Sequence, residues 1–150
     1  MRKVVVAVFV AVVALTGCST VQPSSAPSLA DPNTTGRELS TQFLTLLKSG
    51  DSAGLEAFLA PAFQIQRADG SGETKSEYLA DPASITSFEL GPELTAVQDG
   101  SLLTVRWQLA TNETINGEKL ATGMSPRLST YVWSNGAWRM VSHANFNVIP

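Results

Sequence analysis

The sequence has very little of two residue types on which much protein chemistry depends. Its 150 residues include one cysteine, Cys18, and one histidine, His143. A single cysteine cannot form an internal disulfide, so stability must come from packing. A zinc site takes three or four protein ligands, mainly from these two residue types, and no calcium-loop motif is present. We therefore predict neither a metal nor a cofactor.

Basic residues are also scarce. The chain has 10 lysines and arginines against 13 aspartates and glutamates, a net charge of −3. Proteins that bind nucleic acids carry a basic stripe that pairs with phosphates. Because this chain is mildly acidic, we do not expect nucleic acid as a partner.

The apolar run near the start of the chain is too short to cross a bilayer. Residues 4–15 form an uncharged apolar stretch of twelve residues, whereas a spanning helix needs about 20. Arg2 and Lys3 precede the stretch, and small residues follow it. This is the layout of a secretory signal, which is removed from the mature protein.

The segment Leu15-Thr16-Gly17-Cys18 resembles the lipobox of bacterial lipoproteins. The resemblance implies that residues 1–17 are a lipoprotein signal peptide and that Cys18 becomes an acylated N-terminus, which binds the lipid bilayer. Two or more acyl chains anchor a protein stably. We expect an exported protein, anchored at the cell membrane or outer envelope with its domain outside the cytoplasm. The alternative is a secreted protein with a cysteine near its cleavage site.

The residues after Cys18 are poor in large apolar side chains. Ser, Thr, Pro, Ala and Asn dominate residues 19–35, a composition that cannot bury enough surface to fold. We therefore predict a disordered tether over residues 18–35 and one folded domain over residues 36–150, because the remaining length suits a single core.

The first half of this domain has helical periodicity. Thr35 and Glu38 form a capping-box pattern, apolar residues follow on one helical face, and Gly50 is a typical C-cap. A second helix is expected after Asp51 or Ser52, ending before Pro61, followed by a short strand over residues 63–67. Thr74 and Glu77 repeat the capping-box pattern and predict a third helix over residues 75–80.

The second half alternates with period two and predicts four strands, over residues 86–98, 102–114, 118–133 and 137–148. Asp99-Gly100, Asn116-Gly117 and Asn135-Gly136 are hairpin-turn pairs that separate them. Gly91-Pro92 and Ser125-Pro126 predict bends or bulges. The fold class is therefore α+β, with three N-terminal helices packed on a curved antiparallel sheet made of a four-strand meander and a short first strand.

Over residues 36–148 the chain resembles the nuclear-transport-factor-2-like (NTF2-like) fold, within it the SnoaL-like and DUF4440-type proteins. The resemblance lies in the helix pair leading into Leu59-Ala60-Pro61-Ala62-Phe63, the Asp69-Gly70 turn before Thr74, and residues 135–146. It implies a cone-shaped domain with a pocket at its open end and a homodimer formed through the exposed face of the sheet. Members include isomerases, dehydratases, cyclases and proteins that only bind ligands or partners.

His143 and Asn145 share one face of the last strand. If this face lines the pocket, His143 can transfer a proton and Asn145 can orient a carbonyl, with Tyr131 as a third candidate catalytic residue. The alternative is that His143 and Asn145 bond neighbouring strands or face solvent. We favour this alternative, because the opposite face is more apolar and should point inward; a bulge would reverse the two faces. That opposite face comprises Trp138, Met140, Ala144, Phe146 and Val148.

Aromatic side chains give a second set of candidates. Trp107 and Tyr131 on the sheet, Phe63 on the short strand and Tyr78 on the third helix could bind an apolar, ring-sized ligand together with His143 and Asn145. The alternative is that these rings are ordinary core.

Paired carboxylates are missing from the apolar faces, and Ala62-Phe63 stands where many members have an acidic residue. We therefore expect non-catalytic binding of a small apolar ligand or a protein partner. The first alternative is a small isomerase, dehydratase or hydrolase that uses His143. The second is a structural or accessory lipoprotein of the envelope.

Overall fold

The structure, a computed structural model, describes residues 25–115, 118–119 and 123–146. Within these ranges there are three helices, α1 (Pro32–Ser49), α2 (Ser52–Phe58) and α3 (Lys75–Ala80). The predicted signal peptide, Cys18, the Asn116-Gly117 turn and Val148 lie outside the described residues. None of the described helices is long and apolar enough to span a membrane.

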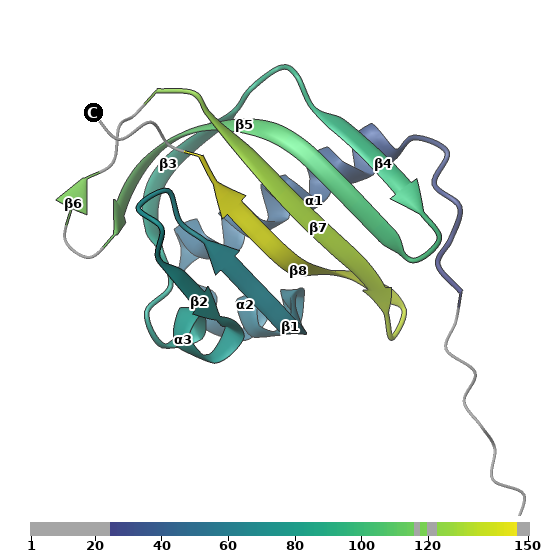
Figure 1. Ribbon diagram of the computed structural model, residues 1–150, viewed down its shortest axis with the longest axis horizontal. Coiled ribbons are helices and arrows are strands. Elements are labelled where there is room, and N and C mark those ends of the chain that lie inside the picture. The colour runs from purple at the N-terminus through teal and green to yellow at the C-terminus, as the bar shows by residue number, and fades with distance from the viewer. Residues whose placement is uncertain (1–24, 116–117, 120–122, 147–150) are drawn as a thin grey trace, which may run out of the picture.

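One curved, open sheet carries the domain (Figure 1). Its strands follow the order β2-β1-β8-β7-β5-β3, and β4 and β6 also pair with β5. Their bounds are β1 (Leu59–Gln66), β2 (Gly72–Thr74), β3 (Ser84–Leu90), β4 (Thr95–Asp99), β5 (Leu102–Ile115), β6 (Glu118–Lys119), β7 (Ser125–Ser134) and β8 (Ala137–Asn145). The mixed α+β class is confirmed.

The pairing of β1 differs from the prediction of a purely antiparallel sheet. β1 runs parallel to β8 and antiparallel to β2. Within the antiparallel meander, β8 pairs with β7 along one side only. The chain reaches the other side of β8 through α1 and α2, and β1 pairs there. The short first strand therefore extends the sheet where the meander ends.

The first helix begins earlier than predicted. Its N-cap is Asp31, whose Oδ1 accepts the backbone N–H of Asn33 at 3.0 Å, and Pro32 occupies the first helical position, where its missing N–H costs nothing. Thr35 was expected as the cap but lies inside the helix. An aspartate followed by proline provides both a cap and a pre-set φ, and here it takes precedence over the Thr35-Glu38 pattern.

Part of the predicted tether is folded. The backbone N–H of Leu29 donates to Oε1 of Gln98 at 2.9 Å, and Nε2 of Gln98 donates to the carbonyl of Pro27 at 2.8 Å. Leu29 also packs against the core. Residues 25–35 therefore belong to the domain, because a side chain of β4 satisfies their backbone groups. Composition alone does not reveal such a contact.

Gly91-Pro92 divides the predicted 86–98 strand into β3 and β4. The N–H of Gly91 donates to the carbonyl of Gln108 at 2.9 Å, and a Cβ at position 91 would lie 2.8 Å from the Cβ of Gln108. Only glycine permits this close approach. The next turn contains Gly100 at φ 54°, and the β7–β8 turn contains Asn135 at φ 51° and Gly136 at φ 79°, as hairpin turns of this type require.

The third helix matches its prediction. α3 spans Lys75–Ala80 after the N-cap Thr74. The carboxylate of Glu77 accepts the backbone N–H of Thr74 at 2.8 Å and its hydroxyl at 2.7 Å. These bonds hold the carboxylate ionised and lower the pKa of Glu77.

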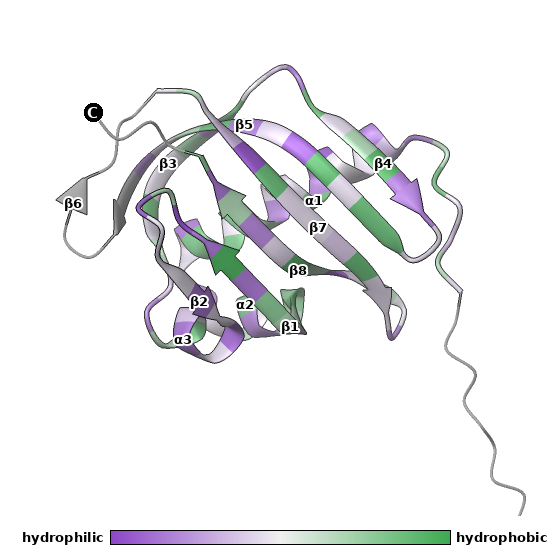
Figure 2. Cartoon of the chain, viewed as in Figure 1, coloured by the Kyte–Doolittle hydropathy of each residue, from purple (hydrophilic) through white to green (hydrophobic). Residues whose placement is uncertain are grey.

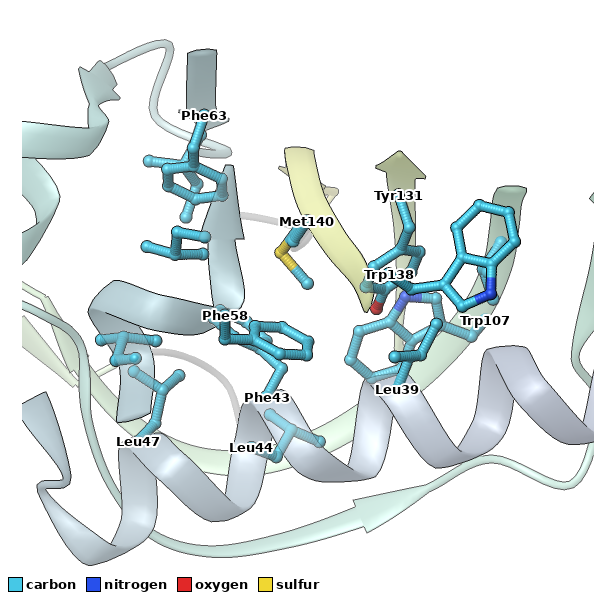
Figure 3. Close-up of a cluster of buried hydrophobic side chains, with 14 of the residues drawn as sticks. Leu39, Phe43, Leu44, Leu47, Phe58, Phe63, Trp107, Tyr131, Trp138 and Met140 are labelled. Atoms are coloured by element: carbon cyan, nitrogen blue, oxygen red, sulfur yellow. The ribbon is translucent and has the colours of Figure 1, made fainter. Parts of the chain in front are cut away.

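The core fills the concave side of the sheet. α1 crosses this side (Figure 1), and apolar and polar residues alternate along the strands (Figure 2). Gly36 lets the helix approach the sheet, since a Cβ there would lie 3.0 Å from Ala96 and 3.1 Å from Val105. The large side chains between α1, α2 and the strands include Phe43, Phe58, Trp107, Tyr131 and Met140 (Figure 3).

Candidate functional site

A bulge in β8 decides where its polar side chains point. Tyr131 of β7 pairs with Met140, whereas Thr130 pairs with Ser142, so Val141 is an extra residue without a partner of its own. An extra residue in a strand reverses the alternation beyond it. Met140 and His143 are therefore both buried although they are three residues apart.

The outward direction expected for His143 and Asn145 was wrong. His143 and Asn145 point into the domain and are only 4% and 5% exposed, while Phe146 is 52% exposed. The inward series holds for Trp138 and Met140 and then changes face at the bulge. Regular alternation along the strand predicted the wrong inward face beyond Met140, because the bulge at Val141 interrupts the alternation.

His143 lies in a closed aromatic environment. Its ring centroid is 5.3 Å from that of Phe43 and 5.9 Å from that of Trp107. Its Nδ1 is 2.9 Å from the hydroxyl of Ser129, which also accepts the indole N–H of Trp107 at 3.1 Å. The hydroxyl hydrogen of Ser129 is then available to Nδ1, which suits a neutral imidazole. The expected bond to a neighbouring strand is thus present, inside the domain.

The surroundings of His143 oppose its protonation. Burial and the positive charges of Arg127 and Arg67 together lower the pKa of His143 to about 3, while Asn145 acts in the opposite direction. A group with this pKa is a weak base near neutral pH and holds no proton to donate. The imidazole can therefore make hydrogen bonds but is poorly suited to proton transfer.

Arg67, directly after β1, forms the second polar centre. Its Nη2 donates to both carboxylate oxygens of Glu73 on β2, at 3.0 and 3.1 Å. The guanidinium also lies 5.8 Å from the ring centroid of Tyr78. Arg67 is only 4% exposed. Through Glu73 and Tyr78 it connects the end of β1 with β2 and α3.

A small cavity lies beside these groups. Its volume is about 10 Å³, enough for about one water molecule. Polar lining comes from Thr111, Arg127, His143 and Asn145, and apolar lining comes from α1, β1, α3, β3 and β5. The apolar and aromatic lining residues are Phe43, Leu44, Leu47, Ile65, Tyr78, Ile85 and Leu109.

The predicted ligand-binding side chains separate into two groups. Tyr78, His143 and Asn145 border this cavity. Three others, Trp107, Tyr131 and Phe63, do not border it and belong to the packed core. The ring centroids of Phe58 and Tyr131 are 6.1 Å apart with the rings edge-on, and those of Phe63 and Tyr78 are 5.5 Å apart. The sheet curves around α1 so closely that these rings fill the space expected for a ring-sized ligand.

Tyr131 has no accessible proton. It is fully buried, and burial raises its pKa to about 12 although the nearby Ser40 and Ser129 hydroxyls oppose the change. Neither hydroxyl reaches hydrogen-bond geometry, so the phenol oxygen has no partner in the described part of the chain. A tyrosine with this pKa in the core is not a candidate acid for a ligand in the cavity.

Sequence reasoning missed Arg127, which borders the cavity, and Arg67, whose charge acts on His143. Both are at least 96% buried, which is uncommon for arginine. One signal was available: Arg127 shares its face with Ser129 and Tyr131, in a strand that otherwise alternates regularly. Arg67 follows the inward Ile65 by two residues, but a turn begins there and hides the pattern.

Two further features bear on the choice of site. A larger groove of about 820 Å³ follows the outer side of α1 and residues 92–94, but it is open to solvent and its lining is mostly exposed. In the described residues, no three His, Cys, Asp or Glu side chains come together as metal ligands do. Buried polar groups gather around the small cavity, and we take that cavity as the site.

No protein-family model matches this sequence, and no curated protein matches it. Solved structures do match. An NTF2-like protein from Cytophaga hutchinsonii aligns at a TM-score of 0.70 and 12% identity, over 79% of this chain and 99% of that one. An NTF2-like protein of unknown function in nutrient uptake from Rhodospirillum rubrum aligns at a TM-score of 0.64 and 18% identity, over 75% of this chain and 98% of that one. A putative ketosteroid isomerase from Shewanella frigidimarina aligns at a TM-score of 0.59 and 14% identity, over 76% of this chain and 96% of that one.

The buried imidazole predicts a pH-dependent stability. His143 has a pKa of about 3 in the folded protein against 6.5 when unperturbed, so only the unfolded chain binds the proton as the pH falls below 6.5. The free energy of unfolding should therefore decrease by about 2 kcal/mol from pH 7 to pH 5 through this group. Urea denaturation of the wild-type chain and of His143→Gln at several pH values measures the effect.

The His143→Gln variant should lose this dependence over the same range. Asp31, Asp69 and Glu77 have lowered pKa values and stay ionised between pH 5 and pH 7, so they do not mask it. Equal pH slopes for the two proteins would show that His143 binds its proton equally well in the folded and unfolded chains, which would contradict the lowered pKa.

Proposed function

We propose that this chain, which has the NTF2-like fold, is a non-catalytic binding domain that takes a small ligand at the polar end of its interior. The observation that carries the proposal is a set of buried polar atoms without partners. Oδ1 of Asn145 and Nε and Nη1 of Arg67 have no hydrogen-bond partner in the described part of the chain. Buried polar atoms are almost always satisfied in folded proteins, so these atoms are suited to meet a ligand.

The same geometry argues for binding rather than catalysis. Proton transfer needs a group whose pKa lies near the working pH, and the pKa of His143 is about 3. Among the described side chains, the carboxylate bonded to this polar group is that of Glu73, which is paired with Arg67. The isomerase, dehydratase or hydrolase alternative would need a proton acceptor that this arrangement does not supply.

The lining defines what the ligand must look like. Ile85, Leu109 and Tyr78 offer an apolar wall, while Thr111 and Asn145 offer hydrogen bonds. A small ligand with an apolar body and one polar end matches both sides. Because the cavity holds only about one water molecule, binding must displace lining side chains, and a large ring system is excluded.

Filling the cavity should abolish binding. Leu109 lines it and is 4% exposed, so Leu109→Phe adds volume where the ligand would lie. Leu128→Phe, on an exposed position of β7, is the matched control. His143 is the single histidine, so its ring signals in NMR report on the site during a screen of small amphiphilic compounds.

We expect at least one compound class to shift the His143 signals in the wild-type chain and in Leu128→Phe, and the Leu109→Phe variant to lose at least about tenfold in affinity. If no compound shifts these signals, the binding function is contradicted and the structural or accessory role is favoured.

We also propose that acylated Cys18 holds the domain at a bacterial membrane, outside the cytoplasm. The folded segment that begins by residue 27 supports a short connection, since Gln98 binds the carbonyl of Pro27. Nine residue steps separate Cys18 from Pro27, so the link can reach at most about 30 Å. Such a tether would keep the β4 edge of the domain toward the lipid.

Cys18→Ala should prevent lipid attachment. We expect loss of metabolic labelling with a fatty acid and loss of the protein from the membrane fraction, or accumulation of the unprocessed chain, because the acceptor thiol is gone. Labelling and fractionation identical to the wild type would contradict the proposal. Ser19→Ala, next to the thiol, should label normally and serves as the control.

The convex face of the sheet is proposed to bind a second copy of this chain. Val97, Leu102 and Leu128 are 64%, 46% and 40% exposed on β4, β5 and β7, and the strand register brings them within three successive rows of the outer face. Exposed apolar side chains grouped on a sheet favour association.

Leu128→Glu should therefore shift the chain from dimer to monomer, because it buries a charge at the contact. Sedimentation equilibrium in detergent measures the mass. Gln42→Glu on the outer side of α1, also exposed, is the control and should leave the mass unchanged. A wild-type chain that is monomeric at all concentrations tested would overturn this contact.

A further inference from the structure

Three buried polar side chains lie side by side across neighbouring strands. Arg127 of β7 is the register partner of Asn145 of β8. On the other side, Ile65 and Gln66 of β1 pair with His143 and Ala144, and Arg67 follows Gln66 directly, close enough to His143 for its charge to lower the pKa of the imidazole. The three side chains form a row, arginine-asparagine-arginine, that is 4%, 5% and 2% exposed from Arg67 to Arg127.

Two members of this row, Arg67 and Asn145, have buried polar atoms without a partner in the described part of the chain. Arg67 uses Nη2 for Glu73, while its Nε and Nη1 have no partner within the described residues. Arg127 donates from Nη1 to the carbonyl of Pro126 at 2.9 Å. Leaving a buried charged donor unsatisfied costs more than leaving a neutral one, so the donors of Arg67 are the strongest attraction for a ligand in this region.

The charge of the row has a definite sign. Two guanidinium groups are close enough to His143 to lower its pKa, and the carboxylate of Glu73 pairs with one of them. The neutral imidazole of His143 adds no charge. The inner end of the cavity is therefore a weakly hydrated region that favours an anion.

We propose that this row binds the carboxylate of the ligand, which makes the ligand class a small aliphatic carboxylic acid. The unpaired Nε–H and Nη1–H of Arg67 are charged donors suited to a carboxylate oxygen. A half-turn of the Asn145 amide would present its N–H groups to the carboxylate in place of the unpaired Oδ1, because the two amide ends are nearly equivalent in shape. The aliphatic part then lies against Ile85 and Leu109. This inference rests on the proposed binding function and specifies the polar end of its ligand.

Butyrate and butyramide are probes of equal size that differ in charge. Titration of the full chain in detergent, followed by the His143 ring signals, should show saturable binding of butyrate at least about tenfold tighter than that of butyramide. Arg67→Gln should remove this preference. Arg106→Gln, which removes a charge from an exposed position of β5, is the matched control and should preserve it.

A second variant keeps the test decisive if Arg67→Gln does not fold. Asn145→Asp builds a carboxylate into the row with little change in shape. It should fold with an unfolding temperature at or above that of the wild type and should lose butyrate binding at least about tenfold, because its own carboxylate occupies the place of the ligand.

The outcomes separate the two proposals. Butyramide binding as tightly as butyrate would overturn the carboxylate assignment and leave the binding function standing. Equal loss of butyrate binding in Arg106→Gln and Arg67→Gln would also overturn it, since a surface charge would then explain the effect. Absence of any shift of the His143 signals with either probe would overturn the carboxylate assignment, and failure of the wider compound screen as well would contradict the binding function.

Discussion

The single extra residue in β8, Val141, determines the chemistry of the interior. Without it, His143 and Asn145 would share the outward face of the strand, and the apolar Ala144 and Phe146 would point into the core. With it, two polar side chains enter the concave side, near a buried arginine of β7 and the buried Arg67 that directly follows β1. Bulges re-aim side chains near functional sites in many sheets, and here the polar end of the domain depends on one.

Burial gives these polar groups a character different from that of a catalytic centre. The imidazole is neutral because desolvation and two positive charges oppose its protonation, and the phenol of Tyr131 is locked in the core. What remains is a set of directed donors and acceptors beside a small cavity. Such groups bind and orient a ligand well, but they do not move protons at neutral pH, which is why binding is the function that the geometry supports best.

Local sequence patterns predicted the fold well where local interactions decide it. The Thr74-Glu77 capping box, the Asn135-Gly136 turn and the Asp99-Gly100 turn act over a few residues, and each lies where it was expected. Prediction failed where distant contacts decide. Gln98 orders the segment before α1 from about 70 residues away, and the parallel pairing of β1 with β8 joins segments from opposite ends of the domain.

The sequence by itself determined the α+β class, the order of the three helices relative to the longer strands, and the absence of a second cysteine or histidine for metal or disulfide chemistry. These follow from periodicity, turn residues and composition, which are local or countable. Only the tertiary structure decided which rings fill the core, that Arg67 and Arg127 are buried, and that His143 faces inward. Those outcomes depend on register and on one bulge, and a shift of one residue reverses the face of every side chain that follows.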